Sequence, residues 1–263
     1  MNMFILILLF LTLCVALVLL TSYVGMRLHK YQMHTPSPID AHLDVVYIPR
    51  YHSYLLGLMR EVDLELDRVQ CPYWIGGGTL LGEARIKGML PFDDDLDIVM
   101  EETQLKKLVE TYDKERFLIF KKTPCGSIWR IRFKEEVLYK GSGAAEIDIF
   151  PMRRTPDNKT LISFGYVAFM WPEHTFQVED VYPLRKTAFH DLQLLAPKNG
   201  IPHLDENYPG WQDVIYVTHV HLDPFTFLWY FLFRRKKPIK ITPKLKEAMC
   251  ATVRNNKAYN FPP

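Results

Sequence analysis

The first 26 residues contain no aspartate, glutamate, lysine, arginine or histidine. From residue 3 to residue 20 the chain is apolar except for Thr12, and a run of this length can cross a bilayer as one helix. A secretory signal peptide is the alternative, but its basic start and small-residue cleavage site are missing here. The sequence therefore predicts a retained transmembrane anchor over residues 1–26, which would contact membrane lipid, followed by a stem over 27–50.

The chain also lacks a large excess of either charge, because it has 32 lysine and arginine residues and 30 aspartate and glutamate residues. This balance argues against a nucleic-acid partner held by a broad basic surface. No C-x-x-C pair is present to indicate a zinc ribbon, and Cys71, Cys125 and Cys250 leave the question of a disulfide open. Hydrophobic residues make up 48% of the chain and charged residues 24%, which is typical of a folded protein. We expect residues 51–263 to form one domain.

The hydrophobic pattern predicts alternating helices and strands, and hence an α/β domain. Thr79 is expected to cap the N-terminus of the second helix. The last third is rich in proline, and we expect it to be irregular. The predicted helices cover 52–69, 79–85 and 104–113, and the predicted strands cover 72–75, 96–100, 128–133 and 145–150.

Two aspartates, Asp95 and Asp97, are separated by one residue at the start of a predicted strand. This spacing places both carboxylates on one face of the strand, while Leu96 and Ile98 point into the core. Asp148 alternates with two isoleucines on the strand over 145–150. If the two strands pair, Asp148 completes a group of three carboxylates, which repel one another unless a cation lies between them. Hard oxygen ligands of this kind suit Mg or Mn.

A glycine-rich turn, Gly76-Gly77-Gly78-Thr79, lies between a strand and a helix upstream of these acids. Such a turn offers backbone N–H groups and a helix N-terminus to phosphate oxygens. Gly77, Gly78 and Thr79 are therefore candidate substrate-binding residues.

The acidic stretch is compatible in principle with two other kinds of site. An EF-hand loop that starts at Asp93 fails, because its sixth residue would be Ile98 and its twelfth Gln104. A D-x-D pair also occurs in metal-dependent glycosyltransferases that use nucleotide sugars, and this alternative stays open. The upstream turn and the downstream Asp148 favour a nucleotidyltransferase-like site.

The stretch GGGTLLGEARIKGMLPFDDDLDI, residues 76–98, resembles the signature of the LicD family. Residues 146–151 resemble the family's second acidic strand, and residues 171–211 resemble its C-terminal part more loosely. Phe92 stands where tryptophan is usual, and Tyr208-Pro209-Gly210 departs from the last motif. The signature is matched by Gly77, Gly78, Thr79, Leu80, Leu81, Gly82, Arg85, Leu90, Pro91, Phe92, Asp93, Asp95 and Asp97.

The resemblance implies a nucleotidyltransferase-like mixed sheet with flanking helices and a metal-dependent phosphotransferase activity. Such enzymes move a phospho-alcohol, of the phosphocholine or ribitol phosphate type, from a CDP-linked donor to a hydroxyl of a glycan or glycoprotein. A non-catalytic Golgi scaffold is a further alternative, but a scaffold has no need of three repelling carboxylates.

The remaining candidates each have a second interpretation. Arg85 follows the glycine turn and suits either a donor phosphate or an ordinary surface position. Arg130 and Arg132 alternate on one strand face, where they can bind a phosphate or the acceptor. Asn158 begins an N-x-T glycosylation sequon, which favours a Golgi or endoplasmic reticulum protein with a lumenal domain. Arg27 and Lys30 favour the opposite orientation.

Overall fold

The computed structural model describes residues 10, 12–17, 20, 49–91, 93, 95–135, 138–139, 143–215 and 239–261. The chain divides into two compact units. The larger unit comprises residues 43–208 and 242–263, and it contains every predicted site residue. The smaller unit comprises residues 1–42 and 209–241. Its described part includes β12 (Val214–Ile215), which pairs antiparallel with β13 (Ile239–Lys240).

The predicted membrane anchor is only partly covered by the described residues. Among those residues, no helix has both the length and the apolar character needed to cross a membrane. Most of 1–26 and nearly all of the stem over 27–50 lie outside the described part. The anchor and the stem therefore stay predictions.

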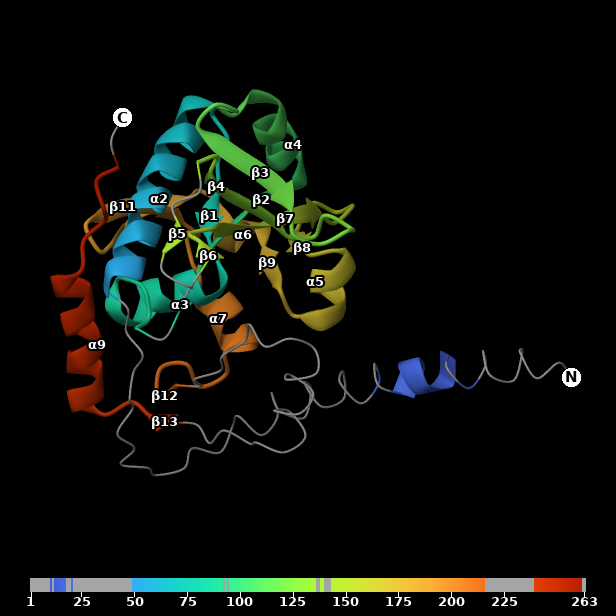
Figure 1. The fold of residues 1–263 in the computed structure, drawn as a ribbon. Coiled ribbons are helices and arrows are strands. Elements are labelled where there is room, and N and C mark those ends of the chain that lie inside the picture. Colours follow the sequence, from blue (N-terminus) through green and yellow to red (C-terminus); the bar gives the residue numbers. More distant parts are fainter. Residues whose placement is uncertain are drawn as a thin grey trace, which may run out of the picture. The chain divides into compact units, whose positions relative to one another are not determined.

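The larger unit is a mixed α/β structure built on a seven-stranded sheet (Figure 1). β2 and β7 run parallel, and the other neighbouring strands pair antiparallel, so the sheet is mixed as expected. Two short strands extend it from the end of β7, where β8 (Thr160–Ile162) pairs with β7 and β9 (Thr175–Gln177) pairs with β8. The main path follows the order β1 (Trp74–Ile75), β2 (Leu96–Glu101), β7 (Ile147–Arg154), β4 (Trp129–Phe133) and β3 (Phe117–Lys121).

Three helices lie where the hydrophobic pattern predicts them: α2 (Pro49–Arg68), α3 (Gly77–Ile86) and α4 (Glu102–Thr111). α2 is amphipathic, and Leu55, Leu58 and Val62 from its apolar side are fully buried. α2 packs against β4 and β7, whereas α4 packs against β2 and β7. α3 is held to the hairpin of β10 (Arg185–Phe189) and β11 (Leu192–Ala196), because the buried carboxylate of Glu83 accepts a hydrogen bond of 2.6 Å from Thr187.

The last third has more regular structure than we expected. Besides the β10–β11 hairpin, it forms α7 (Ile201–Asn207) and α9 (Pro243–Asn255). α9 has clear start signals, because the Thr242 hydroxyl accepts a hydrogen bond from the Leu245 N–H and proline begins the helix. The remaining short elements are α5 (Gly165–Met170), α6 (Val178–Val181) and the strand pair β5 (Leu138–Tyr139) and β6 (Gly143–Ala144). Cys71, Cys125 and Cys250 are free thiols.

Two buried histidines link α7 to β9. His203 stacks on Phe176 with a distance of 3.8 Å between ring centroids, and its Nδ1–H donates to the carbonyl oxygen of Thr175 at 2.8 Å. The neighbouring His174 lies 5.2 Å away, centroid to centroid. Burial lowers the pKa of His203 to about 4 and, together with the charge of His203, lowers that of His174 to about 3. Both rings are therefore neutral in the folded protein at physiological pH.

The histidine pair predicts a loss of stability in mild acid. Above pH 6.5 both states hold neutral rings, and between 6.5 and about 4 only the unfolded chain gains a proton at residue 203. The free energy of unfolding should fall in this window, with up to about 1.4 kcal/mol per pH unit from His203 alone. Urea unfolding at pH 7, 6 and 5 should show a smaller slope in His203→Phe than in the wild type. Equal slopes would contradict this account, whatever the absolute stability of the variant.

Candidate functional site

The three predicted carboxylates meet at the start of the parallel strand pair. Asp97 on β2 lies directly opposite Asp148 on β7, and Asp95 comes just before β2. One carboxylate oxygen of each of Asp95, Asp97 and Asp148 lies within 4.8 Å of the others. The expected pairing of the two strands is therefore confirmed, and it brings the three acids into one cluster, called the acid triad below.

The electrostatics of the acid triad are unfavourable without a cation. Burial, followed by the charges of Asp95, Asp93 and Asp148, raises the pKa of Asp97 well above its usual range. The Gly78 N–H opposes this rise by donating to the Asp97 carboxylate at 2.9 Å. A cation beside Asp97 would therefore stabilise its charged form.

The glycine turn packs directly on Asp97. The Gly76 N–H donates to the Asp97 carbonyl at 3.1 Å, and the Gly78 N–H donates to the Asp97 carboxylate. Gly77 has a left-handed φ of 49°, and a β-carbon there would lie 2.2 Å from Asp97 Oδ2. A β-carbon at Gly78 would lie 2.5 Å from Asp93 Oδ2. The glycines are thus required by the close approach of the acids.

Thr79 differs from its predicted role as a helix cap. α3 begins at Gly77, and its N-cap is Gly76, which has no side chain to offer. The Thr79 hydroxyl instead accepts a hydrogen bond of 2.7 Å from the Asp97 N–H. Thr79 therefore links the turn to the first acidic strand, because its buried hydroxyl accepts the hydrogen bond that the Asp97 N–H would otherwise donate to a neighbouring strand.

Asp148 is bound by two cationic side chains. Lys122 Nζ lies 2.5 Å from Asp148 Oδ2, and Arg130 Nε donates to Asp148 Oδ1 at 2.8 Å. Arg130 also forms an ion pair with Glu146. The predicted residue Arg130 thus faces the acid triad, since it is in register with Asp148 across β4 and β7.

Two of these groups were not predicted from the sequence. Glu146 had a detectable signal, because it precedes Asp148 by two residues and alternates onto the same face. Lys122 had none, because it lies in the connection from β3 to β4 and reaches Asp148 only through the folded sheet.

Arg85 and Tyr208 lie in the electrostatic field of the same site. Burial lowers the pKa of Arg85 to about 10, while Tyr208 acts in the opposite direction. Burial, then the charges of Asp97, Asp93 and Asp95, raise the pKa of Tyr208, and Arg85 opposes this rise. Arg85 is therefore not an ordinary surface arginine. Tyr208, from the loosely matched last motif, joins the site although we did not predict it.

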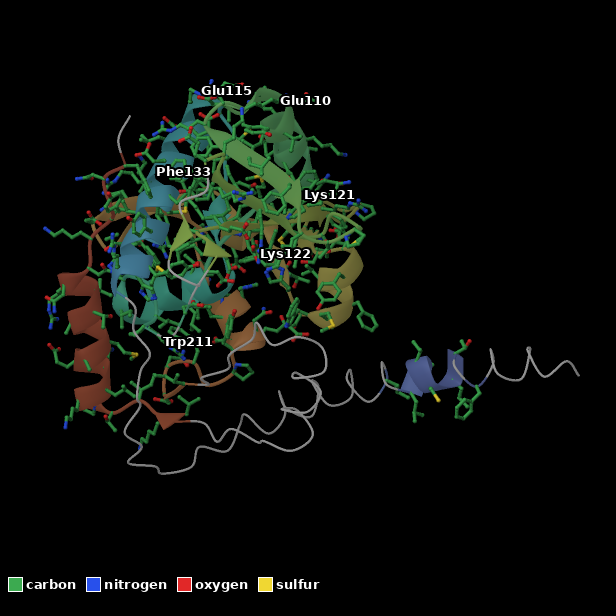
Figure 2. All side chains as sticks on the ribbon, in the orientation of Figure 1. Glu110, Glu115, Lys121, Lys122, Phe133 and Trp211 are labelled. Carbon is green, nitrogen blue, oxygen red and sulfur yellow. The ribbon has the colours of Figure 1, made fainter. Side chains whose placement is uncertain are left out.

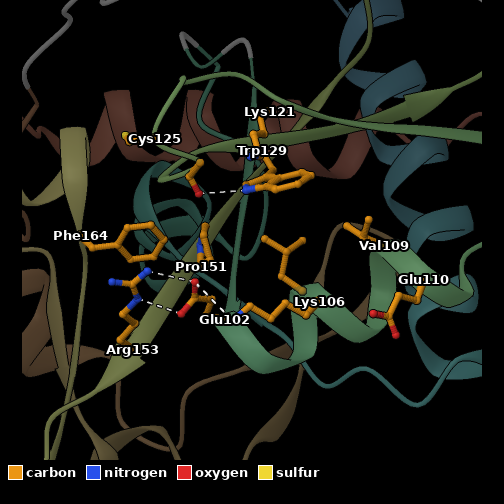
Figure 3. Close-up of a pocket in the computed structure, with 12 residues that line it drawn as sticks. Glu102, Lys106, Val109, Glu110, Lys121, Cys125, Trp129, Pro151, Arg153 and Phe164 are labelled. Carbon is orange, nitrogen blue, oxygen red and sulfur yellow. Dashed lines mark hydrogen bonds and ion pairs between the residues drawn. The ribbon is translucent and has the colours of Figure 1, made fainter.

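A separate groove of about 320 Å³ lies along α4 (Figure 3). Its lining includes Trp129, Pro151 and Phe164, together with the ion pair between Arg153 and Glu102. Trp129 and Pro151 alternate with Arg130 and Asp148 along their strands, so they point away from the face that carries the acids. None of the predicted site residues lines this groove.

Asn158 lies at a surface turn. It is exposed between β7 and β8 and has a left-handed φ of 59°, and its N–H donates to the Thr155 carbonyl at 2.9 Å. A side chain in this position is accessible from solvent.

The comparison with protein families gives one match. The sequence profile described as "LicD/FKTN/FKRP, nucleotidyltransferase domain" matches residues 70–199. This range contains Asp95, Asp97 and Asp148, the glycine turn and both Lys122 and Arg130.

Three curated proteins are similar in sequence. Uncharacterized protein RP689 of Rickettsia prowazekii is 30% identical over 65% of this chain and 60% of its own length. Uncharacterized protein RT0683 of Rickettsia typhi is 29% identical over 73% of this chain and 56% of its own length. The lipopolysaccharide cholinephosphotransferase LicD of Haemophilus influenzae is 39% identical, over 19% of this chain and 18% of its own. The chain thus spans less than two thirds of each relative.

Among solved structures, the lincomycin-bound crystal structure of the lincosamide antibiotic adenylyltransferase LnuA is similar with a TM-score of 0.37. It is 18% identical and is matched over 66% of this chain and 96% of its own.

Proposed function

Residues 70–199 of this chain form a domain of the LicD family, and from this premise we propose that the protein is a metal-dependent phosphotransferase. The proposed reaction moves a phospho-alcohol, of the phosphocholine or ribitol phosphate type, from a CDP-linked donor to a glycan hydroxyl. The acid triad beside the glycine turn is the observation that carries the proposal. The cholinephosphotransferase named among the relatives supports the choice of transferred group.

The donor atoms of the acid triad fit a hard divalent cation such as Mg or Mn. Asp95, Asp97 and Asp148 offer carboxylate oxygens within 4.8 Å of one another, and burial together with the neighbouring carboxylates raises the pKa of Asp97. A cation held there would supply charge neutralisation for the donor pyrophosphate and for the leaving nucleotide. These three side chains would hold it.

The other residues would orient and bind the donor. The glycine turn keeps Asp97 in place through the Gly78 N–H and the Thr79 hydroxyl. Arg130 holds Asp148 in a fixed direction, and Arg85 would add positive charge for a donor phosphate. In the proposed transfer, the acceptor hydroxyl attacks the phosphorus of the phospho-alcohol and the bond to the nucleotide phosphate breaks. A triad aspartate would take the hydroxyl proton.

The nucleotide preference gives a direct test. A CDP-alcohol with Mn²⁺ should stabilise the folded chain by about 2.7 kcal/mol at a hundredfold excess over its dissociation constant. We therefore expect CDP-choline or CDP-ribitol to raise the melting temperature by about 5 °C or more, and only when the cation is present. UDP- and GDP-sugars serve as the controls. A shift with a nucleotide sugar alone would instead favour a D-x-D glycosyltransferase.

We further propose that the domain faces the lumen of the Golgi or endoplasmic reticulum behind the predicted anchor. The exposed position of Asn158 in its turn is compatible with glycosylation there. Expressed in animal cells, the chain should lose mass on endoglycosidase treatment, and Asn158→Gln should abolish that loss. Digestion of the domain by protease added to sealed microsomes would place it in the cytosol and contradict the proposal.

A further inference from the structure

Both carboxylate oxygens of Asp148 are already engaged by cations. Lys122 Nζ lies 2.5 Å from Oδ2, and Arg130 Nε lies 2.8 Å from Oδ1. Asp148 is only 3% exposed, so its charge depends on these two partners more than on water. Each oxygen keeps a second lone pair, but a metal ion that binds Asp148 comes close to the positive charge of these partners, so its binding competes electrostatically with them.

The two cations differ in how firmly they are held. Arg130 lies in β4, in register with Asp148, and it also pairs with Glu146. Its planar guanidinium therefore bridges two acids from a strand inside the sheet. Lys122 lies one residue beyond β3, in the connection to β4, and its side chain is 29% exposed against 27% for Arg130, so the two cations differ in their anchoring and not in their exposure. A lysine is a point charge on a flexible stem, so Lys122 can leave Asp148 without disturbing a strand.

We infer that Lys122 is an exchangeable counter-ion of the acid triad: it occupies Asp148 in the metal-free protein, yields that carboxylate to the cation, and then pairs with a phosphate of the donor. This inference rests on the proposed function, because it assumes that the site binds a divalent cation and a donor that carries a nucleoside diphosphate. After the exchange, each charged group has a partner of opposite charge. Asp148 would serve as a ligand of the cation, and the released Lys122 ammonium would form an ion pair with a phosphate of the donor.

A consequence of this exchange is coupling between the two ligands. The cation alone must break the ion pair between Lys122 and Asp148, which weakens its binding. The donor alone binds weakly too, because Lys122 is still paired with Asp148. Once both are present, every charge has a partner, so each ligand should raise the affinity for the other by the same factor.

Lys122→Gln and Lys122→Met in the full chain test this inference, with Lys121→Gln as the matched control. Lys121 is the preceding residue and is exposed (Figure 2). Its ammonium lies 5.4 Å from the centre of the Trp129 ring, and both residues line the groove along α4 (Figure 3). Lys121→Gln therefore removes the same charge as the Lys122 variants, but on the groove side of the sheet, opposite the face that carries the acids. Circular dichroism melts identify the variants that fold.

The readout is Mn²⁺ affinity measured by calorimetry without nucleotide, followed by CDP-choline affinity at saturating Mn²⁺. Removal of the ammonium should tighten Mn²⁺ binding by about tenfold, because a competing charge next to Asp148 is lost. The same variants should bind CDP-choline about tenfold more weakly, while Lys121→Gln changes neither affinity.

The outcomes separate this inference from the proposed function. If the wild type binds both ligands and the Lys122 variants bind Mn²⁺ equally or more weakly, Lys122 is only a structural partner of Asp148, and the inference is wrong. Unchanged donor affinity would likewise overturn its second half. If neither the wild type nor the variants bind Mn²⁺, the metal site itself is wrong, and the proposed function fails with it.

Discussion

Replacement of Asp97 by asparagine is expected to lower the transfer rate by about a thousandfold or more. Asp97 is the centre of the acid triad, since it faces Asp148 across β2 and β7 and accepts a hydrogen bond from the glycine turn. Asparagine keeps the shape of the side chain but removes the charge that would hold the cation. Transfer can be measured with a radiolabelled CDP-alcohol once an acceptor glycan is found, or as hydrolysis of the donor by water.

The same substitution should not destabilise the metal-free fold. Burial and neighbouring carboxylates raise the pKa of Asp97, which means that its charged form is unfavourable in the folded state at neutral pH. We therefore expect Asp97→Asn without metal to melt at the wild-type temperature or higher. Asp157→Asn, in the exposed turn before β8, is the matched control and should retain full activity.

The three aspartates should also behave as one unit. Asp95→Asn and Asp148→Asn should each cause a loss similar to that of Asp97→Asn, and a double variant should lose little more than either single variant. Losses that multiply, or near-normal turnover in a folded Asp148→Asn protein, would argue against a shared cation. A scaffold without activity would show no turnover in the wild type either.

Alanine at Gly77 is expected to cost about 2–4 kcal/mol of folding stability. Part of this cost arises because Gly77 has a left-handed φ of 49°, which a β-carbon disfavours. The rest arises because the β-carbon would lie 2.2 Å from Asp97 Oδ2, so the carboxylate or the turn must move. Since the displaced group belongs to the acid triad, Mn²⁺ affinity should fall together with stability.

A second glycine separates these two causes. Gly210 also has a left-handed φ, of 74°, but among the described residues a β-carbon there would meet only Val214 Cγ2, at 3.5 Å. Gly210→Ala should therefore cost only about 1–2 kcal/mol and leave Mn²⁺ affinity unchanged. Chemical unfolding and calorimetry of both variants give the comparison. Equal effects on metal binding would show that the close approach to Asp97 has no role in the site.

The pattern of the sequence was sufficient for the central pair of strands. Alternation of isoleucine and leucine with Asp97 and Asp148 fixed which face each acid occupies, and two strands with such faces have few ways to pair in a buried sheet. The glycines of the turn were likewise identifiable from the sequence. The structure shows that glycine is required there because Asp93 and Asp97 approach the turn closely.

Other parts of the site depend on contacts that no local pattern encodes. Thr79 at the start of a helix has the usual appearance of a cap, yet its hydroxyl serves the Asp97 N–H on the neighbouring strand. Lys122 belongs to a loop in the sequence and reaches the acid triad only because β3 and β4 form one edge of the sheet. The helix α9 differs from the irregular structure expected of the last third, because the prolines that suggest irregularity lie mostly before it.

The most direct test of the central claim is a calorimetric titration of the full chain with Mn²⁺ and then with CDP-choline, in the wild type and in the double variant Asp97→Asn and Asp148→Asn. The account predicts that the wild type binds Mn²⁺, binds CDP-choline only with the cation present, and loses both in the double variant although the variant folds. Binding of CDP-choline that is equally strong in excess EDTA, or Mn²⁺ binding that persists in the double variant, would contradict it.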